Sequence, residues 1–120
     1  MKAWKPRFVE NSRVPKFLSR FAPITIGAIS LGFWVFCNAK SNAILRRHET
    51  IHFQQQLELL FVGQWTLYLL FWLIGVIKYR DGREAYYQIP FEREAYENQY
   101  ETNYLENRSR YAWVKYIGDI

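Results

Sequence analysis

The chain has 120 residues, enough for one small domain, and half of them are hydrophobic, which excludes a disordered protein. The net charge is +5, and residues 1–20 alone carry six basic residues against one acidic residue, so the other hundred residues are neutral overall. The single cysteine, Cys37, excludes a disulfide within the chain.

Residues 1–20 form a basic N-terminal arm, interrupted by Pro6 and Pro15, which we expect to be irregular or loosely attached. Positive charge beside apolar segments indicates either a solvated tail or an anionic lipid surface as partner. Nucleic acid is not expected, because no nucleic-acid-binding motif accompanies the arm. The rest of the chain, residues 21–120, is predicted to form a single domain.

The first apolar segment, residues 21–37, is uncharged, rich in β-branched residues and punctuated by Pro23, Gly27 and Gly32. This pattern favours a short β-hairpin over about residues 22–37 that bends near Gly32. Because its length also reaches the lower limit for a membrane span, a membrane helix remains the alternative.

A long helix is predicted from about residue 43 to 78, because Ser41 or Asn42 can cap its start and no proline follows until Pro90. Its second half, residues 59–77, has no charged residue and is apolar on all sides. Such a helix lies in lipid or against a partner subunit. At about 1.5 Å per residue it is about 29 Å long, close to the hydrocarbon thickness of a bilayer.

Beyond a turn at Asp81-Gly82, Pro90 is suited to the first turn of a second helix, predicted over about residues 90–108. Glu92 and Glu94 lie in its first turn, where the helix dipole favours anions. The predicted fold class is therefore α+β, mostly α.

The chemistry of the chain is concentrated in His48-Glu49-Thr50-Ile51-His52, an H-E-x-x-H motif that contains both histidines of the sequence. On a helix, His48 and His52 lie one turn apart on the same face, where both imidazoles can bind one zinc ion. Zinc lowers the pKa of a water molecule, and Glu49 is placed to take its proton. The alternative is two ordinary histidines and a charge on a helix surface.

A catalytic zinc needs a third protein ligand, and without a third histidine a carboxylate is expected. Glu94 is the first choice because the small Ala95 beside it allows two helices to approach closely. Glu92 is the second choice and Glu97 the third; Glu92 and Glu94 point about 200° apart on a helix, so both cannot face the metal. Asn98, one turn beyond Glu94, is expected to orient a ligand.

H-E-x-x-H followed about forty residues later by the glutamates of "EREAYEN" resembles the zincin metallopeptidases, in particular the gluzincins, whose third ligand is Glu. "RHETIHFQQQLELL" with "IPFEREAYENQ" more closely resembles small, uncharacterised bacterial and phage proteins of the zinc metallopeptidase type, over about residues 22–116. The resemblance implies a minimal zincin core in which His48, His52 and Glu94 bind Zn²⁺ and Glu49 is the general base. It also implies that the strand edge before the motif receives an extended peptide. Candidates for the group that binds the oxyanion are Tyr86, Tyr87, Tyr96 and Arg93.

The expected function is zinc-dependent hydrolysis of a peptide or protein substrate by a membrane-associated enzyme, at the inner membrane or its cytoplasmic face. Lipid contact is expected through residues 59–77 and the basic arm, and an oligomer is compatible with the sequence. If residues 59–77 crossed the bilayer, Glu94 would be separated from His52, so a simple span and the zinc site exclude each other. Two other functions remain open: a non-catalytic, membrane-inserted interaction or accessory protein, and a structural zinc protein with Cys37 or a second Glu as fourth ligand.

Overall fold

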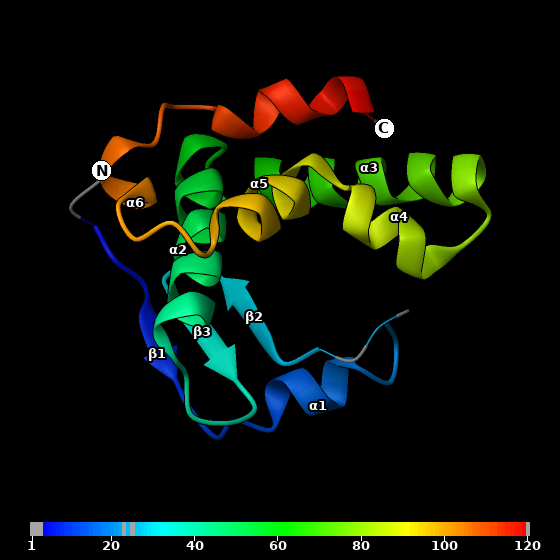
Figure 1. Ribbon diagram of the computed structural model, residues 1–120. Helices are drawn as coiled ribbons and strands as arrows, with labels where there is room; N and C mark the ends of the chain where they lie inside the picture. The colour runs from blue at the N-terminus through cyan, green and yellow to red at the C-terminus, as the bar shows by residue number, and fades with distance from the viewer. Residues whose placement is uncertain (1–3, 23, 25, 120) are drawn as a thin grey trace.

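The computed structural model describes residues 4–22, 24 and 26–119, and it shows a mostly helical fold with a small three-stranded sheet (Figure 1). The predicted class, α+β and mostly α, is confirmed. In chain order the elements are β1 (Arg7–Val9), α1 (Val14–Leu18), β2 (Ala28–Leu31), β3 (Trp34–Cys37), α2 (Ala43–Glu58), α3 (Val62–Tyr79), α4 (Gly82–Gln88), α5 (Pro90–Asn98), α6 (Tyr104–Asn107) and the 3₁₀ helix η1 (Ala112–Asp119).

The predicted hairpin is present as the antiparallel strands β2 and β3, so this segment is not a membrane helix. Leu31 pairs with Trp34, which leaves Gly32 and Phe33 as the two-residue turn. Gly32 has a φ of +63°, a conformation that glycine adopts without steric cost and that two-residue hairpin turns require. The sheet order is β1-β3-β2, with β3 in the centre.

The expectation of an irregular N-terminal arm is wrong for part of that arm. β1 pairs in parallel with β3, and Pro6, just before β1, is buried. Behind β1, the Glu10 carboxylate accepts hydrogen bonds from the backbone N–H and the hydroxyl of Ser41, close to the start of α2. The three residues of β1 are too few for an alternating pattern to be visible in the sequence.

The predicted continuous helix over residues 43–78 is wrong, because it is broken into α2 and α3, which run in different directions (Figure 1). Leu60 and Phe61 both have positive φ, 56° and 60°. The Phe61 N–H donates to the Gln56 carbonyl and the Leu60 N–H to the Leu57 carbonyl, the pair of bonds that closes a Schellman motif. Glycine normally occupies the position that Leu60 holds here, so the sequence carries no stop signal at this point.

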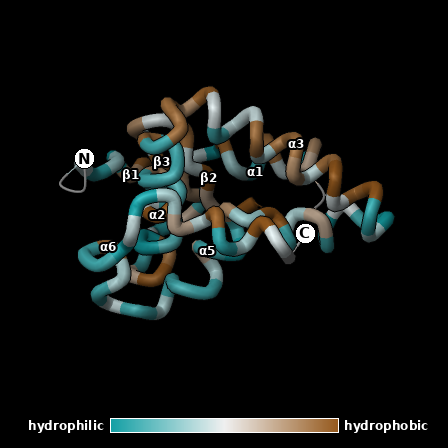
Figure 2. The backbone as a smooth tube through the Cα atoms, turned by 90° about the horizontal axis from the view of Figure 1, so that it is seen from above, coloured by the Kyte–Doolittle hydropathy of each residue, from teal (hydrophilic) through white to brown (hydrophobic). Residues whose placement is uncertain are grey.

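α3 has two different faces, although its sequence is apolar all round. Its inner face packs on the rest of the protein: Gly75 lies so close to α4 that a Cβ atom there would be 2.9 Å from Cβ of Ala85. The Trp72 Nε1–H donates to the Gly82 carbonyl at 2.9 Å, so α4 runs back along α3. By length and composition α3 could cross a membrane, and 17% of its residues are buried inside the protein. Figure 2 shows hydrophobic residues along α3.

The second predicted helix is shorter than expected, since α5 ends at Asn98 and the chain continues through the separate helix α6. A single helix to residue 108 would carry that end about 15 Å beyond Asn98. Instead the chain folds back, and Arg108 reaches both Glu58 and Glu94. η1 then places Trp113 on a buried cluster with Ile89 and Phe91.

Candidate metal centre

Three buried side chains from two helices converge on one point. α2 supplies His48 and His52, one turn apart, and the first turn of α5 supplies Glu92. The two histidine Nε2 atoms are 3.2 Å apart, and Oε1 of Glu92 lies 3.3 Å from Nε2 of His48 and 3.1 Å from Nε2 of His52. A His₂Glu group of this kind could hold a metal ion.

The spacing of these atoms matches a metal site. Two ligand atoms on a tetrahedral zinc ion, each at about 2.0–2.1 Å, are separated by about 3.3 Å. The three separations of 3.1–3.3 Å are close to that value. Two unprotonated imidazole nitrogens and a carboxylate oxygen are also the donor types that zinc prefers. The residues therefore fit a divalent metal, with three protein ligands.

Both histidines are held so that Nε2 faces the cluster. Nδ1 of His48 lies 2.8 Å from Oε1 of Gln99, and Nδ1 of His52 lies 2.8 Å from Oε1 of Gln55. A carboxamide oxygen only accepts, so with these amide orientations each Nδ1 carries the proton; for Gln55 the orientation is also fixed by the two acceptors that face its Nε2. In a neutral imidazole this leaves Nε2 with its lone pair directed at the cluster.

The second oxygen of Glu92 is occupied, because the Tyr68 hydroxyl of α3 donates to Oε2 at 2.7 Å. Glu92 therefore presents one oxygen, Oε1, to the histidines. Burial raises the pKa of this carboxyl, but the charge of His52 and hydrogen bonds from both histidines outweigh burial and lower the pKa well below its ordinary range. Burial lowers the pKa of His52, whereas the Glu92 charge and hydrogen bond raise it, to about 10 in the metal-free protein.

Glu49 is buried beside this cluster, and its Oε2 atom has no hydrogen-bond partner among the residues that the structure describes. Burial raises the pKa of Glu49, while the charges of His52 and His48 oppose the rise. Buried carboxylate oxygens are rarely left unpaired, and those that are call for a functional explanation. An unpaired oxygen next to a metal site is a ready acceptor for a proton from water.

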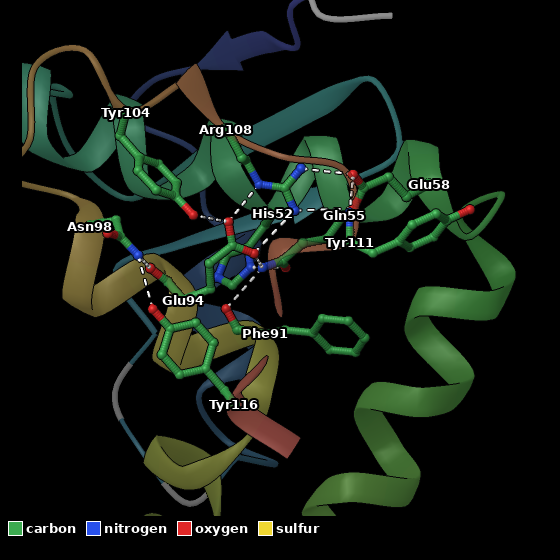
Figure 3. A network of polar contacts seen from close by, with 10 residues as sticks. All are labelled: His52, Gln55, Glu58, Phe91, Glu94, Asn98, Tyr104, Arg108, Tyr111 and Tyr116. Carbon is green, nitrogen blue, oxygen red and sulfur yellow. Dashed lines mark hydrogen bonds and ion pairs between the residues drawn. The ribbon is translucent and has the colours of Figure 1, made fainter. Parts of the chain in front are cut away.

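Glu94 is the first choice for the third ligand from the sequence, and Glu92 is the second. In the structure Glu92 lies with the histidines and Glu94 does not. Glu94 accepts four hydrogen bonds, from Gln55, Tyr104 and, twice, Arg108 (Figure 3). These fill the acceptor positions of the carboxylate and leave none for a metal. The small Ala95 beside it is buried as expected, but that feature does not distinguish the two glutamates.

The other predicted residues lie outside the cluster. Glu97 pairs with Arg93 across one turn of α5 at 3.8 Å. The Asn98 side chain donates to the Glu94 carbonyl and to the Tyr116 hydroxyl, so it joins α5 to η1 instead of orienting a ligand (Figure 3). Cys37 is buried in β3 and is not a member of the His₂Glu group.

Among the candidates for binding an oxyanion, Tyr96 contacts a histidine of the group. Its ring packs against His48 with centroids 4.5 Å apart, and its hydroxyl lies 3.1 Å from the Tyr86 hydroxyl. Tyr87 packs against the outer side of Tyr96. Arg93 is directed elsewhere, toward Glu97 and the Tyr116 ring.

The strand edge expected to receive a peptide is partly filled by the protein itself. The Gln56 side chain donates to the Ser30 carbonyl of β2 and accepts from the Gly32 N–H. It thus forms the two bonds that a neighbouring strand would form at these residues. An extended peptide adding to β2 at Ser30 would first have to displace Gln56.

Sequence reasoning missed four residues that shape the site: Tyr68, Gln55, Gln99 and Arg108. The run of three glutamines at 54–56, directly after the motif on a largely buried helix, is a visible signal, since buried polar side chains need partners. Tyr68 and Arg108 gave no such signal, because their partners lie far away in the sequence. Comparisons with protein-family models, with curated proteins and with solved structures find no match.

Proposed function

We propose that this protein is a zinc-dependent hydrolase of the metallopeptidase type. His48, His52 and Glu92 would hold the metal, and Glu49 would be the general base. The observation that carries the proposal is the convergence of three ligand atoms within 3.1–3.3 Å beside a buried carboxylate with an unpaired oxygen. A metal ion requires converging ligand atoms, and hydrolysis requires a base such as this carboxylate.

Zinc, when bound, supplies Lewis acidity that lowers the pKa of water and polarises a carbonyl group. Glu49 accepts the proton of the attacking water on Oε2 and passes it to the leaving amine. Tyr96, whose ring packs on His48, is the residue that we propose for a hydrogen bond to the developing oxyanion.

Two histidines and one carboxylate also form the ligand set of non-haem iron(II) enzymes. Glu49 favours hydrolysis over oxygen chemistry, since a buried base beside the ligands has a direct role only in the former. Because such sites generally bind zinc more tightly than iron(II), activity and not affinity distinguishes the two possibilities. Peptide cleavage by the zinc-loaded protein supports the proposal, and an activity restored by iron(II) and not by zinc contradicts it.

The test begins with elemental analysis of zinc-repleted wild type and of Glu92→Gln. We expect one zinc per chain in wild type and a large loss in Glu92→Gln. Glu84→Gln, at an exposed carboxylate of α4, is the control and should retain the metal. No zinc in wild type would contradict the proposal.

Catalysis is then tested with Glu49→Gln and an unstructured protein or peptide library as substrate. We expect the variant to retain its zinc and to lose cleavage by at least about a hundredfold, as for other general bases. Full cleavage by Glu49→Gln would exclude Glu49 as the base. Zinc binding without cleavage by wild type would favour a structural zinc protein.

We further propose that the enzyme lies on a membrane through the outer face of α3, which we define as the exposed residues Val62, Trp65, Leu69, Leu70, Leu73, Ile74 and Ile77. They recur every three or four residues along the whole helix. Large contiguous apolar patches on a protein surface mark protein–protein or membrane contact sites. Because Tyr68 on the inner face binds Glu92, α3 stays beside the site and would lie along the lipid surface.

Leu60, just before α3, supports the lipid contact. It combines a positive φ with 81% exposure, two unfavourable features for a leucine. Such a residue is retained where it inserts into something apolar. Lys78 and Arg80, exposed at the other end of α3, would meet anionic head groups.

Co-sedimentation with vesicles tests this contact. We expect wild type to bind anionic phosphatidylglycerol vesicles more strongly than zwitterionic ones, and Leu69→Gln/Leu73→Gln to lose most binding. Ile44→Gln, on α2, is the control at an exposed aliphatic residue elsewhere. No vesicle binding together with a dimer by light scattering would assign the face to a second copy of the chain.

A further inference from the structure

The carboxamide of Gln55 is fully engaged in the buried interior. Its Nε2 donates to the Phe91 carbonyl and to Oε1 of Glu94, both at 3.0 Å, and its Oε1 faces Nδ1 of His52 at 2.8 Å. The residue has no exposed surface. All the donors of this amide, and the acceptor that faces His52, are therefore used.

The direction of this amide is fixed by its partners. A backbone carbonyl and a carboxylate only accept, so the –NH₂ group must face Phe91 and Glu94. The oxygen must then face His52. If the amide were reversed, its –NH₂ group would face Nδ1 and force the proton of a neutral imidazole onto Nε2, the atom needed for the metal.

Glu94 is held in turn by an ion pair with Arg108, which also pairs with Glu58 at 2.9 Å (Figure 3). The Tyr104 hydroxyl donates to Oε2 of Glu94, the oxygen that also accepts from Nε of Arg108. A chain of contacts therefore runs from Arg108 through Glu94 and Gln55 to His52. Arg108 follows α6, Glu94 belongs to α5 and Gln55 to α2, so three parts of the chain fix one imidazole.

Gln99 repeats the arrangement on the other histidine. Its Oε1 faces Nδ1 of His48 at 2.8 Å, and its backbone carbonyl accepts from Arg47 at 2.6 Å. It lies in the turn after α5 and is half-buried. Both ligands from α2 thus have a carboxamide oxygen on the nitrogen remote from the cluster.

We propose that Gln55 and Gln99 are positioning residues, which hold His52 and His48 with the proton on Nδ1 and Nε2 free for a metal, and that Glu94 and Arg108 fix the direction of the Gln55 amide. This inference rests on the proposed metal centre and extends it to residues that do not touch the metal. Glu94, which is not in the cluster, acts on the metal through Gln55. Partners of this kind are worth about 10–100-fold in metal affinity.

The chain offers a close control. Gln56 is the next residue of α2, is equally buried, and also forms three hydrogen bonds, to the Gly32 N–H and to the carbonyl and hydroxyl of Ser30. It contacts the sheet and not a histidine. Gln55→Met and Gln56→Met therefore remove the same number of hydrogen bonds from the same helix, and only Gln55→Met alters a partner of a histidine.

Zinc affinity, measured by competition with a chromophoric chelator, is the first readout. We expect Gln55→Met to bind zinc about 10–100-fold more weakly than wild type and Gln56→Met to stay within about threefold. The second readout is the proton NMR signal of His52 Nδ1–H in the zinc-loaded protein. It should exchange faster with water in Gln55→Met and be unchanged in Gln56→Met.

Equal zinc affinity in wild type and Gln55→Met, or an equal loss in both methionine variants, would overturn the positioning role while leaving the metal centre intact. No zinc in wild type would overturn both. If Gln55→Met does not fold, Gln99→Met, at the half-buried turn, provides the test: a loss of about tenfold supports the proposal, and wild-type affinity contradicts it.

Discussion

The Tyr68 hydroxyl donates a hydrogen bond to Oε2 of Glu92 at 2.7 Å, while Oε1 of the same carboxylate faces the two histidines. Tyr68 belongs to the inner face of α3, so the apolar helix is attached directly to a side chain of the metal centre. The contact leaves Glu92 with one oxygen for a metal and determines which one.

Replacing Tyr68 by Phe should therefore weaken zinc binding by about tenfold, because the carboxylate loses the partner that orients it. The metal-free variant should also lose about 1–3 kcal/mol of unfolding free energy, since Oε2 of Glu92 becomes a buried acceptor without a donor. Chelator competition and urea titration measure the two effects. Tyr104→Phe, which removes a hydroxyl from Glu94 instead, should reduce zinc affinity less; an equal reduction would contradict the special role of Tyr68.

The two neighbouring glutamates should differ when each is replaced by Ala. Glu94→Ala removes a partner of the buried Arg108 and should reduce the free energy of unfolding by about 3–5 kcal/mol. Glu92→Ala should abolish zinc binding with a smaller loss of stability in the metal-free protein. Urea titration with and without zinc gives both values, and a Glu94→Ala variant as stable as wild type would show that the Arg108 pair contributes little.

Leu60→Gly should stabilise the protein by about 0.5–1 kcal/mol. Glycine adopts the left-handed conformation required at this position without the steric cost that leucine bears, and the side chain that is lost is 81% exposed. Chemical denaturation in the absence of lipid measures the gain. The same substitution should weaken vesicle binding, and a loss of stability would contradict our account of the break between α2 and α3.

Gly75→Ala should destabilise the contact between α3 and α4 by about 1–3 kcal/mol. The added methyl group would lie 2.9 Å from Cβ and 3.1 Å from Cα of Ala85, and backbone atoms cannot move aside cheaply. Gly27→Ala is the control, because a Cβ there has no atom within 4 Å. Thermal unfolding of both variants is the measurement, and equal midpoints would show that α4 shifts without cost.

Glu10→Gln should be less stable than wild type at neutral pH, with a difference that disappears in acid. Hydrogen bonds from the backbone and the hydroxyl of Ser41 lower the pKa of Glu10 below its ordinary value of 4.5. A carboxyl whose pKa is lower in the folded state stabilises the protein above that ordinary value and ceases to do so as the pH falls through the folded pKa. Unfolding curves from pH 7 to pH 3 test this, and a difference that stays constant with pH would contradict it.

The sequence predicted the parts of the fold that depend on local chemistry. The hairpin turn at Gly32, the capping of α2 by Asn42 and the start of α5 at Pro90 follow from the backbone preferences of single residues. H-E-x-x-H likewise predicted which face of α2 carries the group that could hold a metal. These features need no information from distant parts of the chain.

The remaining features depend on contacts between distant residues. Glu92 and Glu94 look alike in sequence. Arg108, fourteen residues beyond Glu94, binds Glu94, and this distant contact distinguishes the two glutamates. Leu60 occupies the position after α2 where glycine is usual, so no residue in this part of the sequence predicts the break between α2 and α3. β1 is visible only through its pairing with β3.

Gln56 has a consequence for solubility. Exposed strand edges are templates for aggregation, and natural proteins cover them with charge, proline or another element. Here the last turn of the histidine-bearing helix covers β2 at Ser30 and Gly32 with a single carboxamide. Intermolecular strand addition at that edge requires α2 to move away first, so the helix that carries both histidines also shields this edge of the sheet.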